Sequence, residues 1–411
     1  MIKPGFTTRA IHEPTLGRDA NRALMFPIYA GVAHEFENAE AMEETFTGRR
    51  AAFAYSRIAN PTVTAFERKL TALEDGTGSV AVSSGMAAIS VSLLNLLSKG
   101  DTLVAASSVF GGTYALFKKV FYPLGITVKF VPVTDIGRIE DAMDDSTRAL
   151  FLETVSNPDT MIPDFEEISR IASRHNAAVV ADSTVTTPYL FPAKKFGVNV
   201  VVHSTTKYIS GGATSMGGAI IDLGNFDWSH IPALKEYHRF GSMAFLARLR
   251  CEVYRNTGSC LSPFEAYLQS LGLETLGLRM DRICKNTQAV AEFLEPQNAV
   301  TKVYYPGLAS SPFHGLAKKQ LGGKCGGILA FGLVDRKACF RFLNRLALIR
   351  RASNIGDNKT LAIHPASTIF AELNEQEKRD TGVDDTLIRL SVGIEDADDI
   401  IADIRQALVE S

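Results

Sequence analysis

Short apolar runs alternate with stretches of helical spacing between residues 61 and 207, and this alternation most limits what the chain can fold into. Strands are predicted at 79–83, 103–106, 128–133, 149–153, 177–181 and 200–203, and helices at 86–98, 114–122 and 165–175. Strands that alternate with helices of about 10–15 residues form a mostly parallel sheet with helices on both faces. The sequence therefore predicts an α/β fold.

The remainder of the chain follows other patterns. A chain of 411 residues is too long for one core, so we expect more than one domain. Residues 1–60 have little periodicity and predict an arm that contacts a neighbouring subunit rather than a domain. Residues 61–258 would form the α/β domain and residues 259–411 a smaller α+β domain. In the latter, helices are predicted at 264–271, 278–293, 336–346 and 396–409, and strands at 327–332 and 387–392.

Three groups of polar residues follow predicted strands. Lys207 comes after the strand at 200–203, Asp182 ends another strand, and Ser83-Ser84-Gly85 ends a third. Ligands of parallel sheets bind beyond the carboxyl ends of the strands, so these groups are expected at one cleft. An amine that forms a Schiff base and an acid that keeps a pyridine nitrogen protonated are what pyridoxal 5′-phosphate (PLP) requires.

Each group also has a simpler interpretation. Taken alone, the serine-glycine turn fits a helix N-cap better than a phosphate cradle, Asp182 fits a cap as well as a cofactor contact, and Lys207 fits a solvated strand-end lysine. The occurrence of all three in one α/β domain favours the cofactor. No GxGxxG follows a strand, and the Gly-rich segment 211–218 lacks a P-loop ending, which disfavours a nucleotide fold.

Composition excludes several classes of partner. The net charge of −2 gives no reason to expect nucleic acid or an anionic membrane, and no apolar stretch is long enough for a membrane helix. The five cysteines are scattered without a CxxC pair, so neither a disulfide framework nor a metal site is expected. The first six residues lack the apolar core of a signal peptide. We expect a cytoplasmic protein.

Several motifs along nearly the whole chain resemble the cysteine/methionine-metabolism (trans-sulfuration) family of PLP enzymes. They are the segments 55–62 (YSRIANPT), 84–86 (SGM), 153–158 (ETVSNP), 182–184 (DST), 204–207 (STTK), 272–276 (GLETL), 364–367 (HPAS) and 389–393 (RLSVG). The resemblance implies PLP-dependent transferase fold type I, similar to aspartate aminotransferase, with a mostly parallel seven-stranded sheet. It also implies a homotetramer, a dimer of catalytic dimers.

The family roles carry over to matching residues. Lys207 would hold PLP and shuttle protons, Asp182 would pair with the pyridine nitrogen, and Arg389 would grip the substrate carboxylate. The resemblance implies that Tyr55 and Arg57 reach the phosphate bound by a neighbouring subunit. The remaining implied cofactor contacts are Ser84, Gly85, Met86, Asn157, Thr184, Ser204 and Thr206, and the implied substrate contacts are Asn354 and Glu153.

Departures from the family pattern indicate a subgroup. The family usually places a tyrosine on the cofactor ring, but this chain has Phe110, which can stack and has no hydroxyl. Proton transfers would then fall to Lys207 or Tyr55. Gly112 stands where methionine γ-lyases have cysteine, and segments 212–215, 354–357 and 364–368 resemble those of sulfhydrylases.

We therefore expect an O-acetylhomoserine sulfhydrylase, in which sulfide or a small thiol replaces acetate at the γ-carbon. An ester leaves as a weak base, so it needs less acid assistance than a thiolate and tolerates Phe110. Methionine γ-lyase and cystathionine γ-lyase or γ-synthase are the alternatives. A more distant alternative is an inert interaction protein that has kept the fold.

Overall fold

The computed structural model describes residues 4–12, 19 and 21–409. Parts of the predicted arm, including Pro14, lie outside the described residues. The first three of the six N-terminal residues that lack a signal-peptide core also lie outside them. Within the described part, no helix has the length and apolar character needed to cross a membrane.

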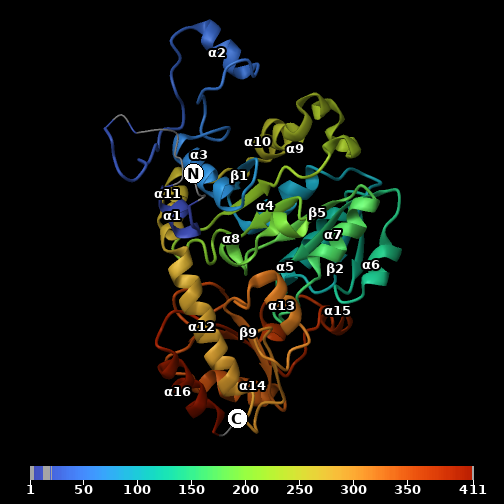
Figure 1. The fold of residues 1–411 in the computed structure, drawn as a ribbon, viewed down its shortest axis with the longest axis vertical. Helices are drawn as coiled ribbons and strands as arrows, with labels where there is room; N and C mark the ends of the chain where they lie inside the picture. The colour runs from blue at the N-terminus through green and yellow to red at the C-terminus, as the bar shows by residue number, and fades with distance from the viewer. Residues whose placement is uncertain (1–3, 13–18, 20, 410–411) are drawn as a thin grey trace.

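A seven-stranded sheet forms the larger part of the molecule, which confirms the predicted α/β fold (Figure 1). Its strand order is β1-β7-β6-β5-β4-β2-β3. The strand β7 is antiparallel to both neighbours, and the other strands run in one direction. The strands are β1 (Gly78–Val82), β2 (Thr102–Ala106), β3 (Thr127–Val131), β4 (Thr147–Glu153), β5 (Ala178–Asp182), β6 (Val200–His203) and β7 (Gly218–Asp222).

Helices cover the sheet because each has an apolar face. In the helix at Phe165–Arg174 (α7), Phe165, Ile168 and Ile171 are buried, and the Asp164 side chain caps the N-terminus by accepting from the backbone N–H of Glu167. The other helices of this part are α3 (Pro61–Leu73), α4 (Gly85–Leu94), α5 (Gly111–Leu116), α6 (Ile136–Ala142) and α8 (Thr187–Leu190). The predicted helix at 114–122 is α5 continued by a π-helical turn, Phe117–Phe121.

Between β7 and residue 258 the chain forms a series of short helices that the sequence pattern did not predict. They are Trp228–His230, Pro232–Met243, α9 (Ala244–Arg248), Leu249–Tyr254 and α10 (Arg255–Thr257).

A five-stranded sheet, in the order β10-β11-β12-β9-β8, forms the core of the C-terminal part. The helix α12 (Leu276–Leu294) runs from the large sheet down beside this second sheet (Figure 1). Two parts with separate sheets agree with the predicted smaller α+β domain, while the boundary at 258/259 stays a prediction. The elements are α11 (Pro263–Glu274), β8 (Lys302–Tyr304), α13 (His314–Leu321), β9 (Ile328–Gly332), α14 (Arg336–Arg345), β10 (Arg350–Arg351), β11 (Leu361–Ile363), α15 (Glu375–Asp380), β12 (Leu387–Ser391) and α16 (Ala397–Leu408).

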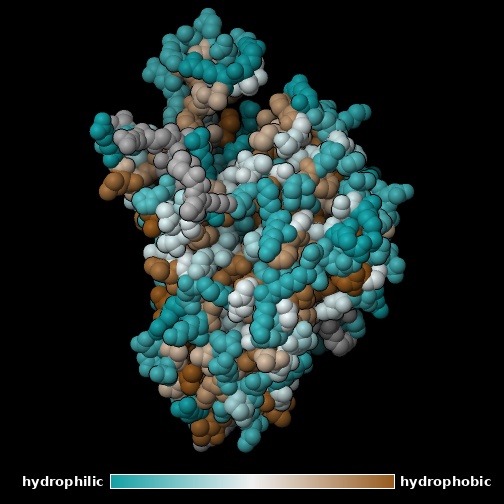
Figure 2. All heavy atoms as spheres, viewed as in Figure 1, coloured by the Kyte–Doolittle hydropathy of each residue, from teal (hydrophilic) through white to brown (hydrophobic). Residues whose placement is uncertain are grey.

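The N-terminal arm is more regular than predicted. It contains α1 (Phe6–His12) and α2 (Ala39–Phe46). The helix α1 packs on its own chain, since Ala10 is buried and Arg9 donates to the backbone oxygen of Ala72. The segment that includes α2 extends beyond the body of the molecule (Figures 1 and 2). It exposes apolar side chains at Leu24, Ile28, Tyr29, Val32, Met42 and Phe46.

Candidate active site

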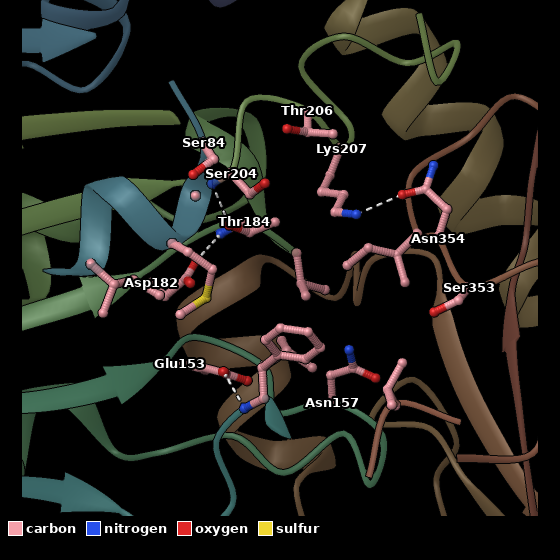
Figure 3. A pocket seen from close by; sticks show the side chains of 18 of the residues that line it. Ser84, Glu153, Asn157, Asp182, Thr184, Ser204, Thr206, Lys207, Ser353 and Asn354 are labelled. Carbon is pink, nitrogen blue, oxygen red and sulfur yellow. Dashed lines mark hydrogen bonds between the residues drawn. The ribbon is translucent and has the colours of Figure 1, made fainter. Parts of the chain in front are cut away.

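A cavity lies beyond the carboxyl ends of β1, β4, β5 and β6, where parallel strands place their terminal residues at one edge (Figure 3). The C-terminal part closes its other side. Of the predicted site residues, the cavity brings together Ser84, Gly85, Met86, Phe110, Glu153, Asn157, Asp182, Thr184, Ser204, Thr206, Lys207, Asn354 and Arg389.

One end of the cavity is lined with hydroxyls at the start of α4. Ser84 is the N-cap of this helix, as its simpler interpretation predicted, and its Oγ accepts from the backbone N–H of Ala87 at 3.1 Å. A Cβ atom at Gly85 would lie 2.5 Å from the Cβ of Ser204, so only glycine lets the helix start approach the β6 loop this closely. Free N–H groups of a helix start beside serine and threonine hydroxyls suit a phosphate.

Two buried carboxyl groups lie on adjacent strands. Glu153 and Asp182 are directly opposite in the β4–β5 register. Burial raises the pKa of Asp182, although its hydrogen bonds with Thr184 oppose the shift. Burial, and then the charge of Asp182, raise the pKa of Glu153 well above its ordinary value. A buried carboxylate is stabilised by a cation, which a protonated pyridine nitrogen would supply to Asp182.

Glu153 lines the cavity and makes a contact with the backbone that was not predicted, while its role as a substrate contact stays a prediction. Its Oε1 accepts from the backbone N–H of Phe110 at 2.7 Å, immediately before α5. The carboxyl group therefore fixes the backbone that carries the Phe110 ring, and it lies on the wall of the cavity with Asp182 and Asn157 (Figure 3).

Lys207 points across the cavity toward the C-terminal part (Figure 3). Its Nζ donates to Oδ1 of Asn354 at 2.6 Å. Burial, and then the charge of Arg389, lower the pKa of the Lys207 amine. A lysine with a lowered pKa holds more of the neutral amine, which can act as a nucleophile or a base.

Arg389 is buried on β12 and is held from two sides. Its guanidinium donates to Oδ1 of Asn157 at 3.3 Å and to the backbone oxygen of Asn354 at 2.9 Å. Burial lowers its pKa to about 10, so it stays positively charged at neutral pH. Its Nε has no hydrogen-bond partner among the described residues. A buried guanidinium with a free N–H suits a carboxylate.

Tyr55 and Arg57 do not line this cavity. The Tyr55 side chain is exposed, and Arg57 donates to the backbone oxygen of Arg255 at 2.8 Å. The cavity of a single chain therefore forms without them, and their predicted role at a neighbouring site stays a prediction.

Some lining residues were not predicted. The missed positions are Ile89, Val155, Val185, Met216, Ser353, Ile355 and Ile369. Ser353 and Ile355 flank Asn354 and could have been inferred from it. Met216 and Ile369 reach the cavity from irregular loops, for which the sequence has no periodic signal.

Comparisons with known proteins identify the family of the chain. Residues 7–409 match the family model of Cys/Met metabolism PLP-dependent enzymes, and the chain belongs to this family. A sulfhydrylase (FUB7) of Gibberella moniliformis is 39% identical, with 99% of this chain and 98% of the relative aligned. An L-methionine gamma-lyase of Pseudomonas putida is 38% identical, with 99% and 98% aligned.

A solved structure has nearly the same fold. It is assigned as an O-acetylhomoserine (thiol)-lyase from Campylobacter jejuni and contains a pyridoxyl-lysine monophosphate. It superposes with a TM-score of 0.94 at 35% identity and covers 98% of this chain and 99% of its own. The fold is therefore the PLP-dependent fold type I, and PLP is the cofactor of the family to which this chain belongs.

Proposed function

We propose that the protein catalyses γ-replacement on O-acetyl-L-homoserine, in which sulfide or a small thiol displaces acetate to give homocysteine or methionine. The observation that supports this most is the combination of Phe110 and Lys207 on the cavity wall. No tyrosine, histidine or cysteine is among the described residues that line the cavity. Lys207 is the basic amine there, and an acetate leaving group requires little acid assistance. The reaction would serve methionine biosynthesis in the cytoplasm.

The residues of the chain would hold PLP and the substrate as follows. Lys207 would bind the aldehyde covalently, Asp182 would hold the ring nitrogen in its protonated form, and the Ser84–Gly85 turn would hold the phosphate together with Ser204. When bound, PLP supplies an electron sink for charge that develops on the substrate carbons.

Arg389 would orient the amino-acid substrate through a bidentate pair with its carboxylate. The Lys207 amine would take the proton from the α-carbon. After proton loss at the β-carbon, acetate would leave with the C–O electron pair and the sulfur nucleophile would add at the γ-carbon as a thiolate. Protons would then return to the β-carbon and the α-carbon, so the net change would be the exchange of acetate for the thiolate. When the Lys207 amine is not bound to PLP, it would donate a hydrogen bond to Asn354. This hydrogen bond would keep the amine near the α-carbon.

We also propose that the active site is completed by a second copy of the chain in a homotetramer. Support comes from the exposed Tyr55 side chain and from the apolar side chains of the projecting arm. Tyr55 and Arg57 of one chain would then contribute to the phosphate site of its neighbour.

The test is product analysis. Purified enzyme with PLP is incubated with O-acetyl-L-homoserine or O-succinyl-L-homoserine, each with sulfide and with methanethiol. Homocysteine or methionine plus acetate from the acetyl ester is the expected result. The Lys207→Ala variant, which lacks the amine, should give no product and no visible cofactor band. Turnover by this variant would contradict the assignment of the base.

A γ-lyase is the second candidate, because a relative with this activity in its name is 38% identical. Ammonia and a 2-oxo acid formed from methionine or cystathionine, at rates above that of replacement, would favour it. A colourless protein that does not react with borohydride would favour the inert alternative.

A further inference from the structure

The two residues proposed to act on the substrate come from different sheets. Lys207 follows β6 of the large sheet, and Arg389 lies on β12 of the small sheet. The substrate carboxylate and the α-carbon are separated by one bond, so the spacing between these two side chains must be held closely. The helix α12 contacts the turn that directly follows Lys207 and the segment that follows β12.

Near the N-terminal end of α12, the Arg279 side chain binds the turn that contains Lys207 (residues 205–210), called the lysine turn below. Its guanidinium donates to the backbone oxygens of Tyr208 at 2.5 Å and Ile209 at 3.2 Å, which directly follow Lys207. It also donates to the backbone oxygen of Gly272 at 2.6 Å. Arg279 is buried, and burial lowers its pKa to about 10. Its Nε donates to the Thr275 hydroxyl at 3.2 Å, and no carboxylate partner is found among the described residues, so its hydrogen-bond acceptors are neutral oxygens.

Further along the same helix, Asn286 holds the segment after the arginine strand. Its Nδ2 donates to the backbone oxygens of Gly393 at 3.0 Å and Glu395 at 2.8 Å. Asn286 is buried, with 1% of its surface exposed. Residues seven apart lie on one face of a helix, about 10 Å along its axis. The lysine turn and the segment after β12 (residues 392–396) are therefore bound to the same face of α12.

A direct contact also joins the two segments. The backbone N–H of Asn358 donates to the oxygen of Gly211 at 2.9 Å, and Ile394 donates to the oxygen of Asn358 at 3.0 Å. These are single backbone bonds between loops. The helix supplies a second connection between the same two segments, and this connection runs through a regular element.

We propose that α12 acts as a strut, meaning a rigid helix that keeps two segments of the chain at a fixed spacing. Arg279 and Asn286 are its positioning residues, and they set the spacing between Lys207 and Arg389. The proposal rests on the roles proposed for those two side chains. Arg279 binds the backbone that follows Lys207, so its proposed action on the lysine is through position.

Glycine binding tests the strut separately from sulfhydrylase activity, because glycine has an amine and a carboxylate and no γ-leaving group. The PLP-loaded enzyme is titrated with glycine, and the change in its visible band gives a dissociation constant. Asn286→Ala should raise this constant at least about tenfold, since a displacement of a positioned group by about 1 Å costs up to about a hundredfold. Arg279→Lys keeps the charge but cannot make all of the guanidinium contacts with Tyr208, Ile209 and Gly272, so it should also raise this constant.

The double variant is the decisive measurement. If both residues act through one strut, Arg279→Lys with Asn286→Ala should raise the glycine dissociation constant by less than the product of the two single effects. Lys285→Met, on the exposed face of α12, is the matched control and should leave the constant unchanged.

Three results would overturn the proposal. One is an Asn286→Ala variant that binds glycine normally, even if its melting temperature falls, since this would indicate a purely structural role. Single effects that multiply in the double variant would show independent action. An equal effect of Lys285→Met would show that any change in α12 perturbs the site. None of these depends on which thiol or ester the enzyme uses.

Discussion

The two walls of the cavity are built differently. On the wall from the large sheet, polar groups are largely bonded within the wall: the backbone N–H of Thr184 donates to Asp182, and the N–H of Ser204 donates to the Thr184 hydroxyl. On the wall from the C-terminal part, Arg389 keeps an Nε without a hydrogen-bond partner among the described residues. This difference fits the proposed roles, in which the first wall would hold PLP and the second would bind the substrate carboxylate.

Only a few bonds cross between the two walls. The Lys207 amine donates to Asn354, and Arg389 donates to Asn157. Each of these pairs joins one wall to the other through a single side-chain hydrogen bond. The division between a cofactor wall and a substrate wall can therefore be tested by the kinetic constant that each substitution changes.

Asp182→Ala should have the larger effect and should act on cofactor and rate together. Loss of one partner of a buried charge pair costs about 3–5 kcal/mol, so we expect kcat to fall by at least about a hundredfold. PLP affinity should fall as well. Steady-state kinetics at saturating PLP and a PLP titration followed by absorbance measure the two effects. Near-normal kcat with normal PLP affinity would contradict the role of Asp182.

Arg389→Ala should act on the substrate and spare the cofactor. Removing one partner of a buried, hydrogen-bonded charge pair costs about 2–5 kcal/mol, so KM for the amino-acid ester should rise roughly a hundredfold. PLP content and the visible band should stay close to those of the unmodified enzyme. Arg389→Lys keeps the charge and loses the bidentate geometry, so it should recover only part of the affinity. An unchanged KM for Arg389→Ala would remove the distinction between the two walls.

The cofactor wall could be predicted from the sequence because its residues terminate recognisable strands. The strands before Asp182 and Lys207 are buried runs rich in valine, and parallel strands bring their carboxyl ends to one edge of the sheet. The strand β7 was missed because Gly218–Asp222 follows a Gly-rich segment and is short. The helices at 228–257 were missed because they are short and interrupted.

The substrate wall could be placed only through family resemblance. Arg389 lies in a predicted strand, but nothing in its spacing indicates that β12 faces the cavity. The contact of Asn354 with Lys207 joins residues 147 positions apart, and it depends on how the two parts pack. The contact of the Glu153 carboxyl group with the backbone of Phe110 was not predicted, while its role as a substrate contact stays a prediction. Such contacts are tertiary and leave no local pattern.

The smallest predicted effect concerns the position of the Phe110 ring, which belongs to the cofactor wall. A Cβ at Gly112 would lie 2.6 Å from Cε1 of Phe110 and 3.5 Å from Sδ of Met86. Gly112→Ala should therefore displace the ring at a cost of about 1–3 kcal/mol, which corresponds to about a tenfold loss or more in kcat/KM.

The same substitution made in a Phe110→Ala background shows how much of the loss in kcat/KM comes from displacement of the Phe110 ring. There the added methyl group meets no ring, so Gly112→Ala should cost much less, and a double-mutant cycle in kcat/KM measures the difference. Gly315 on α13 is the control, because a Cβ there meets no atom within 4 Å, and Gly315→Ala should leave kcat/KM unchanged. If Gly112→Ala lowers kcat/KM equally in both backgrounds, Gly112 acts on the backbone of α5. The position of the Phe110 ring would then not depend on Gly112.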